Sequence, residues 1–255
     1  MINFTPSPVL INISGIEIRY YGIFIALAVL LGLFLASKET KKQKLNPDIT
    51  FDLVLYGAIS GIIGGRLLHV FSNLPYYTKN PFQIIAVWNG GLSLHGGLLL
   101  GILTITLYLY IKRANIWKYL DIIAPSMVLA QAIGRWGNFF NQEAFGLPTK
   151  LPWGIFIEVT KRPLLYKNFE YFHPTFFYEF LCNILIFIVL LILRRKKFIK
   201  TGEITLIYLI SYSFFRFMIE ILRLDSVYIY SLKLEQLLSV AIIIIAGIVF
   251  YERRK

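Results

Sequence analysis

Seven apolar stretches constrain this chain more than any other feature of its sequence. They lie at 20–37, 51–70, 92–111, 119–137, 175–193, 203–221 and 234–251. A helix that crosses a bilayer needs about 20 mostly apolar residues. The chain is 57% hydrophobic and only 16% charged, against about 25% charged in a soluble domain. We therefore expect an all-α polytopic membrane protein with seven transmembrane helices, in which residues 1–255 form a single integral-membrane domain.

Basic residues follow every second apolar stretch. They are Lys38, Lys41, Lys42 and Lys44, then Lys112, Arg113 and Lys118, then Arg194, Arg195, Lys196, Lys197 and Lys200, and finally Arg253, Arg254 and Lys255. Because Lys and Arg are enriched in cytoplasmic loops, we expect the N-terminus outside and the C-terminus in the cytoplasm. This placement accounts for the net charge of +12. It predicts a multi-pass protein of the cell inner (cytoplasmic) membrane and no nucleic-acid partner.

Two further patterns refine this topology. Residues 138–174 form the longest expected extracytoplasmic segment, and they contain aromatic residues such as Trp153 and Phe169 that prefer the membrane interface. We expect this segment to form a small extracytoplasmic cap. Gly57, Gly61 and Gly65 recur every four residues, which predicts a smooth helix face suited to close packing.

Polar side chains recur toward the outer ends of the expected spans, where burial of charge is costly and often marks a functional site. They come from separate stretches and are Tyr21, Arg66, His95, Arg135, Asn138, Asn141, Glu143, Tyr212, Arg216, Glu220 and Arg223. Tyr212, Arg216 and Glu220 are four residues apart and share one helix face. Together these residues predict a polar cavity near the outer leaflet, although any one arginine would also fit an interfacial anchor.

Arginines at one depth indicate an anionic ligand. Guanidinium groups bind phosphate in a bidentate fork and stay charged in a low-dielectric site, so a phospholipid headgroup is the simplest ligand. Glu143 and Glu220 would orient the arginines or balance neighbouring charges, but Glu220 equally fits a simple pair with Arg216 one turn away. His95 is a candidate proton acceptor, because imidazole titrates nearest neutral pH. A structural histidine between helices is an equally good interpretation.

Motifs in chain order resemble those of the bacterial prolipoprotein diacylglyceryl transferase family. The most specific is GRWGNFFNQEAFG at 134–146. The others are RYYGI at 19–23, GGRLLHV at 64–70, NGGLSLHGGLLLG at 89–101, HPTFFYE at 173–179 and RFMIEILR at 216–223. The chain departs from the family pattern at His69, where a tyrosine is usual. The resemblance runs from about residue 16 to residue 225.

This resemblance implies an enzyme and its substrates. The family transfers the sn-1,2-diacylglyceryl group of phosphatidylglycerol to the lipobox cysteine of a preprolipoprotein signal peptide, at the outer leaflet. A thioether forms and glycerol phosphate leaves. The implied catalytic residues are His95, Arg135 and Arg216, and the implied substrate-binding residues are Tyr21, Arg66, Asn138, Glu143, Tyr212 and Glu220. We expect no metal and no other cofactor, and we expect membrane lipids around the helices.

Two other classes of protein would also place arginines in a membrane cavity. A transporter for an anionic solute would need a path to the cytoplasm, yet the inner halves of the expected spans carry few ionisable residues. A non-catalytic binding protein for a phospholipid or an anionic solute would have no particular need for His95. Both remain alternatives at the level of the sequence.

Overall fold

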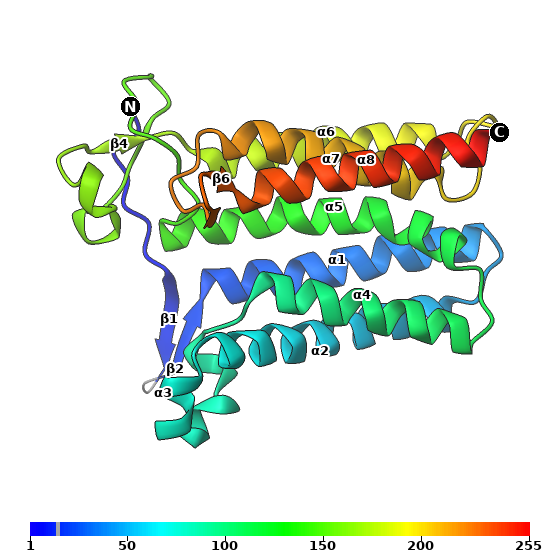
Figure 1. Ribbon diagram of the computed structural model, residues 1–255, viewed down its shortest axis with the longest axis horizontal. Helices are drawn as coiled ribbons and strands as arrows, with labels where there is room; N and C mark the ends of the chain where they lie inside the picture. The colour runs from blue at the N-terminus through cyan, green and yellow to red at the C-terminus, as the bar shows by residue number, and fades with distance from the viewer. Residues whose placement is uncertain (14–15) are drawn as a thin grey trace. The chain divides into compact units, whose positions relative to one another are not determined.

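A computed structural model describes residues 1–13 and 16–255 of the chain, and helices dominate it (Figure 1). The chain divides into two compact units. The first unit comprises Met1–Leu35 and Leu120–Lys255, and the second comprises Ala36–Tyr119.

Each of the seven apolar stretches forms one helix. They are α1 (Tyr20–Lys42), α2 (Pro47–Ser72), α4 (Leu94–Ile111), α5 (Ile116–Asn141), α6 (Thr175–Leu193), α7 (Glu203–Glu220) and α8 (Leu234–Arg254). Within the described residues, six of them are long and apolar enough to cross a membrane. The exception is α7, in which Glu203, Arg216 and Glu220 interrupt the apolar sequence. The chain is thus an all-α polytopic membrane protein, and the count of seven spans stays a prediction.

Short elements connect the long helices. They are α3 (Leu74–Lys79), η1 (Pro81–Ile84), η2 (Val87–Asn89), η3 (Val159–Lys161), η4 (Leu164–Tyr166), β1 (Val9–Ile13), β2 (Ile16–Arg19), β3 (Ile155–Phe156), β4 (Tyr171–Phe172), β5 (Tyr228–Ile229) and β6 (Leu232–Lys233). The strands pair as three antiparallel ribbons, β1 with β2, β3 with β4 and β5 with β6. In the first ribbon Asn12 lies opposite Glu17.

In the second unit, glycines allow α2 and α4 to pack at close range. A Cβ added at Gly64 would overlap the carbonyl of Gly96, and one added at Gly61 would lie 3.8 Å from the carbonyl oxygen of Gly97. The backbone N–H of Ser93 donates a 2.9 Å hydrogen bond to Gly65. The predicted smooth face of α2 therefore forms the contact with α4, and small residues of this kind let helix backbones approach closely in lipid.

In the first unit, polar contacts fix both ends of α7. At its start, the backbone N–H groups of Gly202 and Thr205 donate hydrogen bonds of 2.5 Å and 2.9 Å to the carboxylate of Asp121 on α5. The fully buried Glu203 also pairs with Arg254 at the end of α8.

At the end of α7, the Lys233 ammonium donates hydrogen bonds to the backbone carbonyls of Glu220 and Arg223, at 2.6 Å and 2.9 Å. These bonds satisfy backbone groups that a helix terminus leaves without internal partners.

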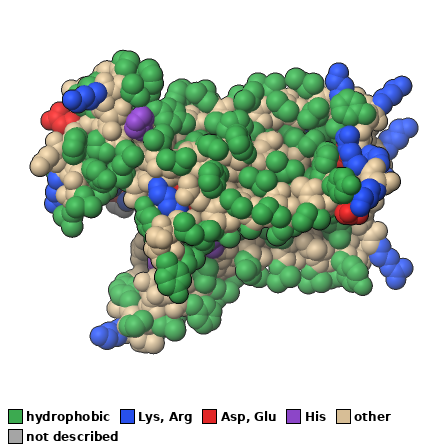
Figure 2. Space-filling view, turned by 45° about the horizontal axis from the view of Figure 1, so that its top comes forward, with side chains coloured by type: hydrophobic (Ala, Val, Ile, Leu, Met, Phe, Trp, Pro, Cys, Tyr) green, Lys and Arg blue, Asp and Glu red, His purple; other side chains and the backbone are tan. Residues whose placement is uncertain are grey.

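Apolar side chains also cover much of the surface. On the face shown in Figure 2, hydrophobic side chains cover much of the surface. On α8, Ile245 is 63% exposed. Because exposed apolar patches of this extent are rare on soluble monomers, the surface is suited to lipid.

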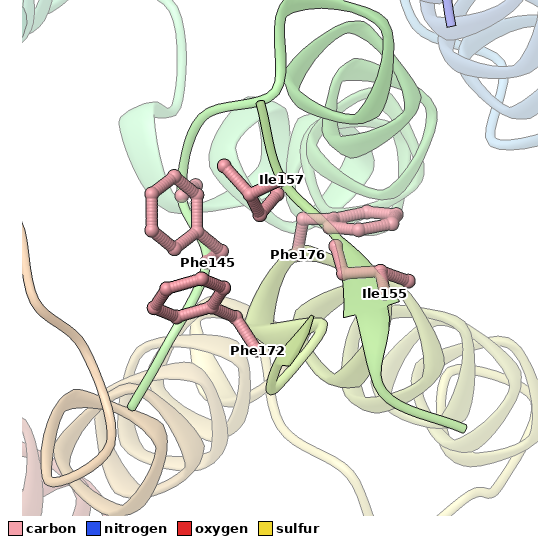
Figure 3. Packing of buried hydrophobic residues seen from close by; sticks show 6 residues of the cluster. Phe145, Ile155, Ile157, Phe172 and Phe176 are labelled. Carbon is pink, nitrogen blue, oxygen red and sulfur yellow. The ribbon is translucent and has the colours of Figure 1, made fainter. Parts of the chain in front are cut away.

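A small apolar core lies within the 138–174 segment, which the sequence predicts to be a cap, and extends to the start of α6. Figure 3 shows this cluster, which consists of Ala144, Phe145, Ile155, Ile157, Phe172 and Phe176. The N-terminal segment joins the cap through a hydrogen bond of 2.9 Å from the Ile2 N–H to the Gly154 carbonyl. Phe176 belongs to α6, so this core also fastens the cap to the beginning of that helix.

Gly96→Ala is expected to destabilise the protein, because the new Cβ would overlap the Gly64 carbonyl and lie 2.6 Å from the Leu68 Cβ. Overpacking of this kind typically costs about 1–3 kcal/mol. The matched control is Gly247→Ala on α8, where the added Cβ meets nothing within 4 Å. The thermal unfolding midpoint in detergent should fall only for Gly96→Ala. Equal midpoints for the two variants would contradict the close packing of α2 on α4.

Candidate active site

One buried carboxylate, Glu179 of α6, lies at the centre of three arginines in the first unit. Its Oε1 accepts hydrogen bonds from Arg216 at 2.8 Å and Arg223 at 2.6 Å. Its Oε2 pairs with Nη2 of Arg135. The three arginines come from α5, α7 and the turn after α7. The structure thus brings Arg135 and Arg216 together, with Glu179 between them.

Further carboxylates neutralise two of these arginines. Arg216 pairs with Glu220 at 2.8 Å, one helical turn away, as the spacing predicted. Asp225 accepts two hydrogen bonds from Arg223, at 2.9 Å and 2.5 Å. Although burial tends to raise the pKa of Asp225, the hydrogen-bonded Arg223 lowers it below the usual value. Glu220 is fully buried and also accepts a 2.5 Å hydrogen bond from Ser226.

Arg135 differs from the other two arginines in its carboxylate partners and in its exposure. Glu179 is its only carboxylate partner among the described residues. Its Nε has no hydrogen-bond partner within the described part of the chain, and its Nη1 makes one long contact of 3.4 Å with Asn138. Its side chain is also the most exposed of the three, at 21%. Tyr212, one turn before Arg216 on α7, interacts electrostatically with the guanidinium.

The Glu143 carboxylate contacts two asparagines of its own motif, and the expectation that it positions the arginines stays a prediction. Its Oε1 accepts hydrogen bonds from the side-chain amides of Asn138 at 2.8 Å and Asn141 at 3.3 Å. The reason is the backbone: Gln142 has φ of 52°, a left-handed conformation that cannot continue the helix. Glu143 therefore turns back over the end of α5, and it reaches Arg135 only through Asn138.

Glycines of the 134–146 motif make room for neighbouring groups. A Cβ at Gly137 would collide with the ring of Tyr21, so this glycine lets the Tyr21 side chain lie against α5. A Cβ at Gly146 would lie 2.9 Å from the carbonyl oxygen of Leu222. The next residue of the cap, Leu147, donates a 2.8 Å backbone hydrogen bond to that same carbonyl. The cap is thereby joined to the turn that carries Arg223.

Arg66 lies in the second unit and has a different environment from the one the sequence suggested. All five N–H donors of its guanidinium group have backbone carbonyl acceptors in the segment between α2 and α4. The acceptors are Gln83, Ile84, Ala86, Gly90 and Gly91. Because a guanidinium has five such donors, none is left for a phosphate in this arrangement. The side chain is 6% exposed and organises this segment.

The histidines have separate settings. His95 is the second residue of α4, in the second unit, and is partly buried. Its convergence with Arg135 on one site stays a prediction.

The other two histidines contact tyrosines. His69 packs edge-on against Tyr77. His173 does not cap α6 through its side chain. Its Nδ1 instead lies 3.1 Å from the Tyr178 hydroxyl, and burial lowers its pKa.

The sequence reasoning missed Glu179 and Asp225. Glu179 ends the HPTFFYE motif and is the lone carboxylate in the 19-residue helix α6, whose other residues are mostly apolar. An ionisable residue in such a span is itself a signal of function, and it would have identified Glu179. Asp225 offered no comparable signal, because its role depends on the turn that follows α7.

Comparisons with known proteins identify the family of the chain. The chain matches the sequence model of the family described as prolipoprotein diacylglyceryl transferase over residues 8–252. It is 42% identical over 253 residues to the phosphatidylglycerol–prolipoprotein diacylglyceryl transferase of Synechocystis sp., covering 96% of this chain and 89% of that protein. It is 43% identical over 248 residues to the protein of the same name from Synechococcus elongatus, covering 95% and 86%. The resemblance found in the motifs is thus confirmed, and the chain belongs to the prolipoprotein diacylglyceryl transferase family.

Proposed function

We propose that this chain catalyses the first step of lipoprotein maturation. It transfers the sn-1,2-diacylglyceryl group of phosphatidylglycerol to the lipobox cysteine thiol in the signal peptide of a preprolipoprotein. The observation that carries this proposal is the family match over residues 8–252. The similar proteins bear the names of both substrates. The cluster of three arginines supports it further, since it offers what a phosphodiester needs.

In the proposed reaction, the thiolate sulfur of the lipobox cysteine attacks the glyceryl carbon next to the phosphate. A carbon–sulfur bond forms, the carbon–oxygen bond to the phosphate breaks, and glycerol phosphate leaves with the electron pair. A thiolate is the nucleophilic form of cysteine. His95 is our candidate to take the thiol proton. Arg135 and Arg216 stabilise the negative charge that builds on the leaving phosphate.

Other polar residues of the first unit complete the proposed substrate site. Tyr21, Asn138 and Tyr212 lie around Arg135 and would hydrogen-bond to the lipid headgroup. Glu143 would hold Asn138, and Glu220 would hold Arg216. For Arg66, its five carbonyl partners favour a role in shaping the segment between α2 and α4 over direct contact with the lipid.

We also propose that all seven long helices cross the cytoplasmic membrane, with the N-terminus outside and the arginine cluster toward the outer leaflet. The 138–174 segment would then be an extracytoplasmic cap on a single membrane domain. In the first unit, the loop after α6 and the end of α8 place basic residues together, because Lys200 Nζ lies 3.3 Å from the Arg253 carbonyl. This fits the rule that basic residues stay inside. Arg216 lies 13 residues beyond Glu203, or roughly 20 Å along α7, toward the opposite end.

The purified protein, given phosphatidylglycerol and a lipobox peptide, is expected to form a thioether product detectable by mass. Arg135→Lys should lower this activity by about a hundredfold or more, because lysine lacks the planar fork that binds phosphate. A wild-type protein that forms no product would refute the function. An Arg135→Lys variant with full activity would refute the role of Arg135 alone.

His95→Gln is expected to slow turnover while binding of phosphatidylglycerol persists. Glutamine keeps hydrogen-bonding capacity but cannot take a proton at neutral pH, and general-base catalysis typically contributes about 10²–10⁴-fold. The measurement is the single-turnover rate at saturating lipid, together with lipid affinity. An undiminished rate would exclude His95 as the base.

Lys41→Cys, in a Cys182→Ser background, should react with a membrane-impermeant thiol reagent only after the membrane of intact cells is opened. Position 41 is exposed and lies just before the loop that follows α1. The control is Lys150→Cys, an exposed position in the cap, which should react from outside. The reverse labelling pattern would invert the topology.

A further inference from the structure

We propose that Glu179 is a positioning residue, whose carboxylate orients Arg135, Arg216 and Arg223 so that they present N–H donors to the phosphate of the lipid substrate. The inference rests on the proposed function, because it takes a phosphodiester as the ligand. It assigns a role to a side chain that the sequence motifs alone left without one.

The first argument is geometric. Arginine side chains have many rotamers, and ordering one costs about 1.5–2 kcal/mol in lost freedom. Here three of them, from three different segments, meet the two oxygens of one carboxylate. A shared partner fixes their mutual orientation as well as their individual positions. Correct orientation matters in a phosphate site, because guanidinium binds phosphate through a planar fork.

The second argument is that the arginines depend on Glu179 unequally. Arg216 has Glu220 as a second close carboxylate, and Arg223 has Asp225. Among the described residues, Arg135 has Glu179 alone. Removal of the Glu179 charge should therefore disturb Arg135 most, and the Arg135 side chain is also the most exposed of the three.

The third argument concerns burial. The Glu179 side chain is 4% exposed, whereas that of Arg135 is 21% exposed. A lipid phosphate that approaches the cluster from its accessible side would thus meet the arginine and not the carboxylate. Glu179 acts through the arginines, so removal of its carboxylate should weaken lipid binding and slow turnover.

The test is Glu179→Gln, which keeps the shape of the side chain and removes its charge. We expect KM for phosphatidylglycerol to rise about tenfold and kcat/KM to fall about a hundredfold, as for a misplaced catalytic group. KM for the lipobox peptide should stay within about twofold, because the peptide thiol does not use this cluster. If both KM values and kcat match the wild type, Glu179 has no positioning role.

The matched control is Glu203→Gln. Glu203 is also fully buried and paired with an arginine. It is the first residue of α7, whereas Arg216 of the arginine cluster lies near the other end of that helix. It should lower the thermal midpoint without a selective change in KM for phosphatidylglycerol. Should Glu179→Gln behave in the same way, with a lower midpoint and no selective lipid defect, its role is purely structural and the proposal is wrong.

Glu179→Asp keeps the test decisive if Glu179→Gln does not fold. Aspartate keeps the negative charge but withdraws it by one methylene group, so charge neutralisation persists while the geometry changes. If Glu179 positions the arginines, the KM of this variant for phosphatidylglycerol should rise. If Glu179 only neutralises charge, the kinetics should match the wild type, and that result would overturn the proposal. Because every variant is compared with an active wild type, failure of the positioning role is distinct from failure of the proposed function itself.

Discussion

The site depends on one electrostatic constraint, which is that three guanidinium groups lie together in a largely buried region and need countercharges. Isolated charges are strongly destabilised away from water, and adjacent like charges repel. Glu179, Glu220 and Asp225 supply three negative charges against the three of Arg135, Arg216 and Arg223. Removing one partner of a buried pair typically costs about 3–5 kcal/mol. The positions of α5, α6 and α7 near this cluster are therefore tied to the charges that they carry.

The same principle operates at the other end of α7 without a role in binding. Glu203 is buried with Arg254, and Asp121 satisfies the first backbone N–H groups of the helix. α7 is thus held by polar contacts at both ends and by apolar contacts with α5 and α6 between them. A helix that buries charged side chains needs such partners, because an unpaired buried charge is strongly destabilising.

The sequence predicted the long helices well, because hydropathy alone identifies a span and motif spacing identifies a helix face. The pair of Arg216 and Glu220 could also be read from that spacing. The Glu179 contacts could not, because they join residues that are distant in sequence. The five carbonyls around Arg66 depend on the path of an irregular segment, and the direction of Glu143 depends on the backbone of Gln142. Neither is encoded by residue type alone.

The backbone pairing between the cap and the turn after α7 has a mechanical consequence. The backbone N–H of Leu147 donates a hydrogen bond to the backbone carbonyl of Leu222. Gly146 has no side chain, so the two backbone segments lie close together here. A hydrogen bond of this kind transmits displacement with little slack, unlike a contact between flexible side chains. The place of the segment bearing Arg223 is therefore tied to the backbone at Leu147 as well as to its own carboxylate partners.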